Sequence, residues 1–394
     1  MHSSNTEFSA PSSKLESWKY SKVESFLRLE HPVHEADQIS AFQDLPAEIT
    51  QLIGTEGSTI VFYNGQLVSC ISEKKYNAAS ATSFEPLNYL DSLNFTQSSD
   101  GVNLVIDNDK ETVRLNIVYL YGNRIEGTTQ PTRINLRNNI QVKGRSSVRL
   151  FEVHIALNDL EFSLNQSSRL EVSDSAKLER VKCFWLGDDS YAYDLEDIQV
   201  KNQADVKNLL LQMGGKWSRI EQSADLLDEE ASYKSLGAYL LGGSGHCDMT
   251  TNIEHKVGNT NSEQLFKGVV TESSRSAFSG RIIIHQDAQK SATAQLNQNV
   301  ILGNRAEADS KPQLEVYADD VTASHGSTIG GLNDDEIFYL RSRGIPKDQA
   351  VEMAAKAFVH DLAERLEDEN LKAQVARILE PGFARYVQAS LGDY

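Results

Sequence analysis

The sequence has little cysteine, and the cysteines lie far apart. Cys70, Cys183 and Cys247 are the three in 394 residues, and no two of them have C-x-x-C spacing. This excludes a disulfide framework and a closely spaced zinc site, and it points to a reducing compartment. No apolar run approaches the roughly 18 residues of a membrane-spanning helix. The first residues contain no apolar signal-peptide core, so we expect a cytoplasmic protein.

Positive charge is also scarce. Lysine and arginine number 38 against 56 aspartate and glutamate residues, which gives a formal net charge of −18. A surface this acidic repels phosphate backbones and anionic lipid head groups. Binding to nucleic acid or to a membrane is therefore not expected.

Motifs for nucleotide or hydrolytic chemistry are missing too. The sequence has no G-x-x-x-x-G-K-[ST] loop, no G-x-S-x-G elbow and no H-E-x-x-H helix. Gly242-Gly243-Ser244-Gly245 does not match the dinucleotide fingerprint, because no βαβ pattern surrounds it. We identify no catalytic residue and expect a chain that neither hydrolyses nucleotides nor holds zinc by itself.

Residues 1–100 are predicted to form a small N-terminal α/β domain. Residues 14–29 carry apolar side chains at helical spacing, and 47–53 indicate a second, short helix. Asn64-Gly65 between two apolar runs predicts a hairpin, because a type I′ turn needs positive φ at both central residues. Residues 78–100 are polar and aperiodic, so we place a domain boundary there.

Residues 101–330 are a succession of short strand patterns, with a helical pattern at 204–213 as the exception. Such a succession favours a sandwich, a barrel or a solenoid. A small or acidic residue, then Ala or Val, then a strand recurs, and Ala288, Ala306 and Val321 are 18 and 15 residues apart. A coil of three short strands fits this spacing, so the repeat favours a parallel β-helix. The predicted strands are 102–106, 113–119, 148–155, 178–185, 238–241, 281–285 and 313–317.

Residues 331–394 are predicted to form a helical domain. Asn333 or Asp334 can cap a first helix, Pro346 can open the second, and the last is expected to stop at Pro381-Gly382. These helices are amphipathic and too few for a large core of their own. Each must bury its apolar face on the β region or on a partner.

One group of residues could form a metal corner. His246 and Asp248 share a face if they lie in a strand, Cys247 stands between them, and His255 is near in sequence. The alternative is a buried polar pair whose hydrogen bonds are satisfied within the fold.

Two further positions could carry chemistry. Asp319-Asp320 at a strand end could bind calcium or act in acid–base work in a β-helix carbohydrate-active enzyme, or simply open a turn. His325, beside Gly326 and just before the helices, could ligate iron or help to hold a nascent cluster, or be a turn histidine.

Several of these segments together resemble the SufB/SufD family of the SUF iron–sulfur cluster assembly system, and within it the SufD branch. Weaker similarity extends over most of the chain. Residues 100–210 resemble the family only in their general residue pattern, without specific motifs. The most specific stretches are 278–284, 288–290, 311–321, 324–330 and 337–345.

The resemblance implies a mostly β chain with a central right-handed parallel β-helix at 101–330, a small N-terminal domain and C-terminal helices. It implies a scaffold rather than an enzyme, in a complex with two partners. The paralogue SufB pairs with it β-helix to β-helix, and the ATPase SufC docks on the C-terminal helices. The candidate partner contacts are Phe338, Tyr339, Arg341, Arg343 and Phe358.

The resemblance also implies that His325 lies at the SufB interface, as a candidate ligand of iron or of a nascent iron–sulfur cluster. Many relatives have a cysteine two residues earlier, where this sequence has Ala323. SufB has an essential cysteine near the position of Asn297, and no cysteine follows Cys247 here. The chain alone is therefore not expected to bind a cofactor tightly.

Two alternatives stay open beside the scaffold. One is the carbohydrate-active enzyme built on Asp319 and Asp320, although such enzymes are mostly secreted. The other is a homodimeric scaffold that acts without SufB, since exposed β-helix edges can pair with themselves.

Overall fold

The computed structural model describes residues 8–32, 47–54, 56–71, 84–98, 100–122, 132–157 and 161–388. One sheet consists of β1 (Ser58–Tyr63), β2 (Gln66–Ile71), β4 (Val113–Tyr121), β6 (Ser147–Ala156), β8 (Lys177–Trp185), β10 (Asp205–Met213), β12 (Ser232–Leu241), β14 (Asn261–Val270), β16 (Ala292–Ile301) and β18 (Thr322–Gly330). The other consists of β3 (Asn103–Asp107), β5 (Thr132–Lys143), β7 (Phe162–Val172), β9 (Tyr191–Val200), β11 (Trp217–Leu226), β13 (His246–His255), β15 (Arg275–Ile284) and β17 (Glu307–Val316). The helices are η1 (Glu16–Trp18), α1 (Glu24–Leu27), α2 (Ala47–Ile53), α3 (Tyr89–Gln97), α4 (Asp334–Ser342), α5 (Lys347–Glu364) and α6 (Glu369–Tyr386).

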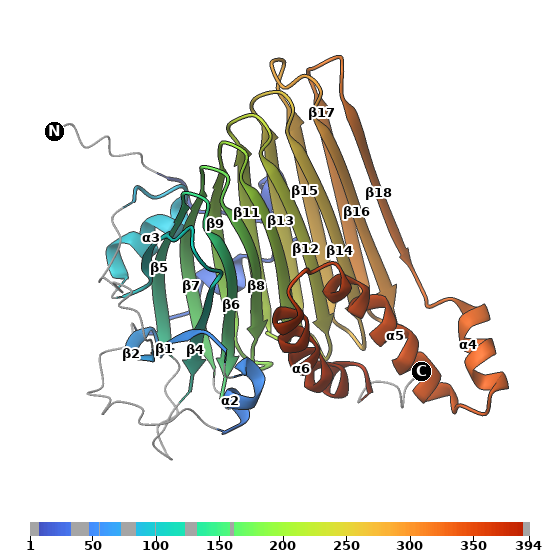
Figure 1. Cartoon of the computed structure of the whole chain (residues 1–394). Helices are drawn as coiled ribbons and strands as arrows, with labels where there is room; N and C mark the ends of the chain where they lie inside the picture. Colours follow the sequence, from blue (N-terminus) through green and yellow to red (C-terminus); the bar gives the residue numbers. More distant parts are fainter. Residues whose placement is uncertain are drawn as a thin grey trace.

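The two sheets lie face to face and form a flattened solenoid (Figure 1). From β3 onward the chain alternates between them, and from β5 onward each strand pairs in parallel with the strand two places earlier. The hairpin of β1 and β2 extends the ten-stranded sheet at its N-terminal end. The mostly β fold with a parallel β-helix is thus confirmed, while the domain boundaries at 100 and 330 stay predictions.

One coil consists of two long strands rather than three short ones. Trp217 of β11 pairs with His246 of β13, so a coil takes 29 residues at this point. The spacing of Ala288, Ala306 and Val321 is therefore half a coil. These residues stand in the corners before β16, β17 and β18, where Ala288 is fully buried and the other two pack against the core. The repeat was a true signal of the solenoid, but it marks each corner rather than each coil.

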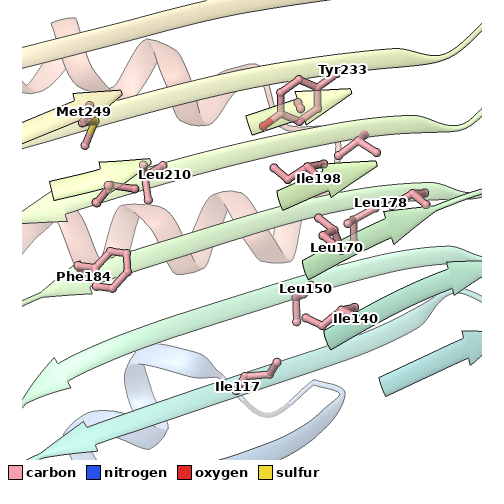
Figure 2. Packing of buried hydrophobic residues seen from close by; sticks show 14 of the residues in the cluster. Ile117, Ile140, Leu150, Leu170, Leu178, Phe184, Ile198, Leu210, Tyr233 and Met249 are labelled. Carbon is pink, nitrogen blue, oxygen red and sulfur yellow. The ribbon is translucent and has the colours of Figure 1, made fainter. Parts of the chain in front are cut away.

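The core lies between the two sheets, because alternate side chains of every strand point inward. Figure 2 shows Leu150 and Phe184 of the ten-stranded sheet facing the same interior as Leu170 and Ile198 of the other sheet. All four side chains are at most 3% exposed. The result is one continuous apolar cluster that runs from coil to coil.

Glycines within the strands make room for large side chains of the neighbouring coils. A Cβ on Gly268 would lie 2.0 Å from the ring of Tyr239. The Tyr239 ring therefore crosses this position, and its hydroxyl donates to Asn299 and accepts from Asn297 Nδ2 at 3.2 Å. All three polar side chains are buried, so the glycine is what lets this hydrogen-bonded group form.

The helix predicted over 14–29 is wrong. Two short helical turns, η1 and α1, replace it on the outer face of the eight-stranded sheet. Trp18 stacks on Tyr193 with 6.1 Å between ring centroids, and Phe26 stacks on Trp217 at 5.1 Å. The apolar side chains of this segment make these contacts with the sheet. The contacts outweigh the helical preference of the sequence.

Other local predictions have mixed outcomes. The short helix at 47–53 is α2, and the predicted hairpin turn is confirmed, with φ of 44° at Asn64 and 82° at Gly65. The helical pattern at 204–213 is wrong, because these residues form β10, whose side chains are buried on both faces. The aperiodic segment before residue 100 contains α3, which packs on β5 and β7.

Two of the three C-terminal helices lie on the chain's own solenoid. α5 packs on β12 and β14, and α6 packs on β8 and β12 (Figure 1). Val359 and Ile378 of these helices are fully buried in one cluster with Leu209 and Leu240 of the sheet. None of the helices in the described part of the chain is long and apolar enough to cross a membrane.

The last helix does not stop at Pro381-Gly382 as predicted. α6 continues to Tyr386 because its second half is held against the sheet. A Cβ on Gly382 would lie 2.3 Å from the sulfur of Met213, and Phe383 is fully buried. This close packing stabilises the helix past the proline.

Replacing Gly268 by alanine is expected to lower the free energy of unfolding by about 1–3 kcal/mol, because the new methyl group would overlap the Tyr239 ring. Gly330→Ala is the matched control, since a Cβ there meets no atom within 4 Å, and we expect a change within about 0.5 kcal/mol. Urea unfolding of both variants measures the difference. Equal stability of the two variants would contradict the account of Gly268.

Candidate functional site

The last coil, formed by β17 and β18, is an open end of the solenoid. Among the described residues, β17 pairs with β15 alone and β18 with β16 alone. Backbone N–H and C=O groups on their outer edges therefore have no ladder partner. No residue of either strand is buried. We call the outer edges of β17 and β18 the end face.

His325 stands in the middle of the end face. It is exposed and lies in register with Gln295 of β16, while Ser327 lies in register with Asn297. Gln295 and Asn297 are buried and point into the solenoid. By the alternation of a strand, Ala323, His325 and Ser327 share this inward-facing side. The imidazole therefore lies over a polar interior, at the place where that interior opens to solvent.

A neutral imidazole at this place can ligate a metal through a ring nitrogen. No group of three or more His, Cys, Asp or Glu side chains within the described ranges is arranged to hold a metal ion. His325 can offer one ligand at most, and Ala323, two residues before it, can offer none. An iron ion at the end face would need its other ligands from a second molecule.

Exposed apolar side chains flank the end face. Tyr317 is 61% exposed after β17, and Ile329 is 48% exposed near the end of β18. Next to Ile329, a hollow of about 480 Å³ lies between β18, α4 and α5, lined in part by Glu336 and Phe358. The end face and α4 thus meet in one continuous region of the surface.

α4 projects beyond the last coil (Figure 1), contacts α5 and has no buried residue. Phe338 is 73% and Tyr339 58% exposed, and the Arg343 guanidinium lies 5.2 Å from the Tyr339 ring centroid. Phe358 lies elsewhere, half-buried on α5 beneath the ammonium group of Lys267. The four predicted contacts that share α4 and its C-terminal end are Phe338, Tyr339, Arg341 and Arg343.

The residues of the predicted metal corner do not converge. Asp248 forms a buried ion pair with Arg219, whose guanidinium lies 3.8 Å from the Trp18 ring centroid. His246 shares the outward face with Asp248, but it is 4% exposed, and burial lowers its pKa to about 4. His255 points inward instead, into the core. The geometry favours a structural role for all of them.

The acid pair forms a corner. Asp319 and Asp320 are exposed between β17 and β18. The Asp320 N–H donates to Gln289 Oε1 at 2.9 Å, and its carbonyl accepts from the Lys290 N–H at 2.6 Å. These contacts join the corner to that of the preceding coil, as a turn-opening residue would.

The cysteines are not placed for chemistry at the end face. Cys183 and Cys247 are free and buried, and burial raises the pKa of the Cys247 thiol to about 12. The side chain of Cys70 lies outside the described residues.

The sequence analysis missed a set of ionisable side chains inside the solenoid. Arg180 and Lys182 of β8 point inward, as do Asp194 and Glu196 of β9 and Glu152 of β6. A local signal was there, because Arg180 and Lys182 alternate with Val181 and Cys183, and Asp194 and Glu196 flank Leu195. In a strand with one face exposed to solvent, these charged side chains would point to the solvent. Both faces of β8 and β9 are covered, so the charged side chains are buried instead.

Comparison with known proteins gives one family. The family model described as SUF system FeS cluster assembly, SufBD core domain, matches residues 124–358, which is more than half of the chain. The chain is 29% identical to the iron–sulfur cluster assembly protein SufD of Escherichia coli, over 95% of this chain and 90% of that protein.

Two further relatives are matched over shorter stretches. A SufBD family protein of Synechocystis is 30% identical over 51% of this chain and 45% of its own length. The SufD of Plasmodium berghei is 28% identical over 64% of this chain and 19% of its own length. This chain therefore spans less than half of each of these two proteins.

Proposed function

The chain belongs to the SufBD family of the SUF system for iron–sulfur cluster assembly, and from this premise we propose that it is a non-catalytic scaffold subunit of the assembly complex. In this proposal its end face pairs with SufB, and α4 docks the ATPase SufC. The observation that carries the proposal is the end face itself, an uncapped parallel ladder with an exposed histidine at its centre.

Pairing with SufB follows from the backbone of the last coil. The outer edges of β17 and β18 offer rows of N–H and C=O groups, and a second β-helix offers matching rows. Pairing would also cover apolar side chains such as Tyr317 and Ile329. In the absence of SufB the same edges favour a homodimer.

Cluster formation at this interface follows from the ligand count. His325 contributes one nitrogen ligand, and with Ala323 beside it the chain adds no thiol there. SufB would supply the cysteine and complete the site for iron or for a nascent cluster, which is cargo of the complex. The free thiols of Cys183 and Cys247 suit the reducing cytoplasm in which we place the complex.

Docking of SufC on α4 follows from what the other helices do. α5 and α6 bury their apolar faces on the solenoid, so they hold α4 in place rather than seek a partner. α4 presents Phe338 and Tyr339 to solvent with Arg341 and Arg343 beside them. Exposed aromatic residues next to arginine are typical of the centre of a protein interface.

Substituting Phe338 and Tyr339 together by aspartate is expected to weaken SufC binding at least about 30-fold, the effect of losing one strong interface anchor. Titration of the purified chain with SufC measures the dissociation constant. Val105→Asp is the control, because Val105 is 58% exposed at the other end of the solenoid. Unchanged affinity in the α4 variant would refute docking at α4. Removal of residues 334–394 is a less clear test, since it would also uncover the sheet beneath α5 and α6.

Replacing His325 by alanine is expected to leave the complex assembled but to lower its iron and acid-labile sulfide content about tenfold or more, because a direct metal ligand is lost. Size measurement of the complex with SufB and SufC reports assembly, and metal and sulfide analysis reports the cluster. Ser327→Ala, on the same side of β18, serves as the control. Normal cluster content in the His325 variant would make this histidine a turn residue.

A further inference from the structure

Five ionisable side chains are enclosed in the middle of the solenoid, away from the end face. Glu152, Arg180, Lys182, Asp194 and Glu196 are each at most 2% exposed. They come from β6, β8 and β9 and meet where the two sheets face each other. An ionised group this deeply buried is stable only when its charge is compensated. We call these five residues the buried charge cluster.

The contacts within the buried charge cluster are short and direct. Arg180 Nη2 donates to Glu152 Oε2 and to Glu196 Oε1, both at 2.7 Å. Lys182 Nζ donates to the two carboxylate oxygens of Asp194 at 2.7 and 2.8 Å and to Glu196 Oε1 at 2.9 Å. It also lies 3.6 Å from Glu152 Oε1.

The charges in this cluster do not balance. Three carboxyl groups face two cations, so one negative charge is left over if every group is ionised. His154, whose Nε2 lies 3.3 Å from Glu152 Oε1, does not compensate it. Its ring is stacked between Tyr119 and Phe184 with centroid distances of 4.3 and 4.4 Å, and burial lowers its pKa to about 4.

The surplus proton has a natural place on Asp194. Glu152 and Glu196 each contact both cations, whereas Asp194 contacts Lys182 alone. Burial raises the pKa of Asp194 to about 7, in agreement with this geometry. The remaining titratable groups that face the cluster are the hydroxyls of Tyr119, Tyr121 and Tyr233, whose pKa values burial raises above the usual range, so they stay neutral.

A line of polar side chains leads from this cluster toward the end face. Gln222 Nε2 donates to Glu196 Oε2 at 2.8 Å, and the Ser235 hydroxyl donates to Gln222 Oε1 at 3.1 Å. Thr251 of the next coil is the register neighbour of Gln222, and Gln264 is that of Ser235. Strand register, rather than a printed hydrogen bond, therefore places the next polar side chains beside these two in the interior.

The line continues to the coil beneath His325. The Thr251 hydroxyl donates to Gln264 Oε1 at 2.7 Å, and Gln295 Nε2 donates to the same oxygen at 3.3 Å. Gln295 is in register with His325. Within the described residues, Gln264 Nε2 and Gln295 Oε1 are buried without a protein partner. Buried polar atoms of this kind are usual partners of internal water, and a water molecule bound here would carry protons between them.

We propose that the buried charge cluster is a proton-binding site, and that the polar line through Gln222, Thr251 and Gln264 connects it to the end face. The reaction is a proton transfer: the carboxylate of Asp194 takes one proton and becomes a carboxylic acid. On release, Asp194 returns a proton to Lys182, and Lys182 passes one of its own to Glu196, where the line begins. The site needs no metal, oxidant or partner, so it stands apart from the proposed scaffold role.

The first test is the pH dependence of unfolding in the full chain. A carboxyl group whose pKa is higher in the folded state stabilises the fold below its unfolded pKa and loses this effect as pH rises through the folded value. From pH 5 to 7 the unfolding equilibrium constant of the wild type should therefore rise tenfold per pH unit relative to that of Asp194→Asn. Asp197→Asn is the control, since Asp197 is on the same strand but pairs with Arg169 outside the core. Identical slopes for wild type and Asp194→Asn would overturn the proton site.

The second test uses infrared spectroscopy and needs no destabilising variant. The wild-type protein should show the carbonyl band of a protonated carboxyl group at pH 6 that disappears above pH 8. Absence of a band with this titration would overturn the proton site even if the Asp194 variant did not fold. After a pH jump, Gln264→Leu should slow the change of this band at least tenfold, while Gln298→Leu, on the outward face of β16, should not. Equal rates in all three proteins would overturn the path.

Discussion

The structure depends on one constraint, which is that the backbone of each coil is satisfied by the coil that follows it. Every strand of the solenoid between β4 and β16 has a parallel neighbour on both sides. The last coil has such a neighbour on one side within the described residues, so β17 and β18 carry their unpaired donors and acceptors outward. Because unpaired edges invite another chain, the place where the repeat ends is also the place where we expect the partner.

The remaining elements serve this arrangement by covering the sheets without covering the end. The N-terminal segment and α3 lie on the eight-stranded sheet, and α5 and α6 lie on the ten-stranded sheet (Figure 1). α4 is left exposed next to the last coil. Covered faces and one open end thus leave exposed the two surfaces where we propose that partners dock, and a line of polar side chains runs through the interior from Gln295 to Glu196.

The sequence predicted the fold wherever inward and outward residues differ in polarity. The strand at 113–119 is found because its inward side chains are apolar, whereas β16 was missed because Thr293, Gln295 and Asn297 point inward. The spacing of Trp18 and Phe26 predicted a helix. Spacing along the sequence does not show which surface the side chains contact, and here they contact the eight-stranded sheet. His325 was found through the family resemblance, and its place at an open end became visible with the topology. The buried charge cluster joins residues from three strands, and no local pattern contains that information.

Hydrogen–deuterium exchange with and without SufB tests the pairing of the end face most directly. Amides on the outer edges of β17 and β18 should exchange fast in the isolated monomer, at a concentration too low for the homodimer, because no strand covers them there. They should become protected about 100-fold or more when SufB binds. The exchange rates of amides in β3, at the other end of the eight-stranded sheet, should not change. Protection that appears at β3 while β17 and β18 still exchange fast would contradict the account.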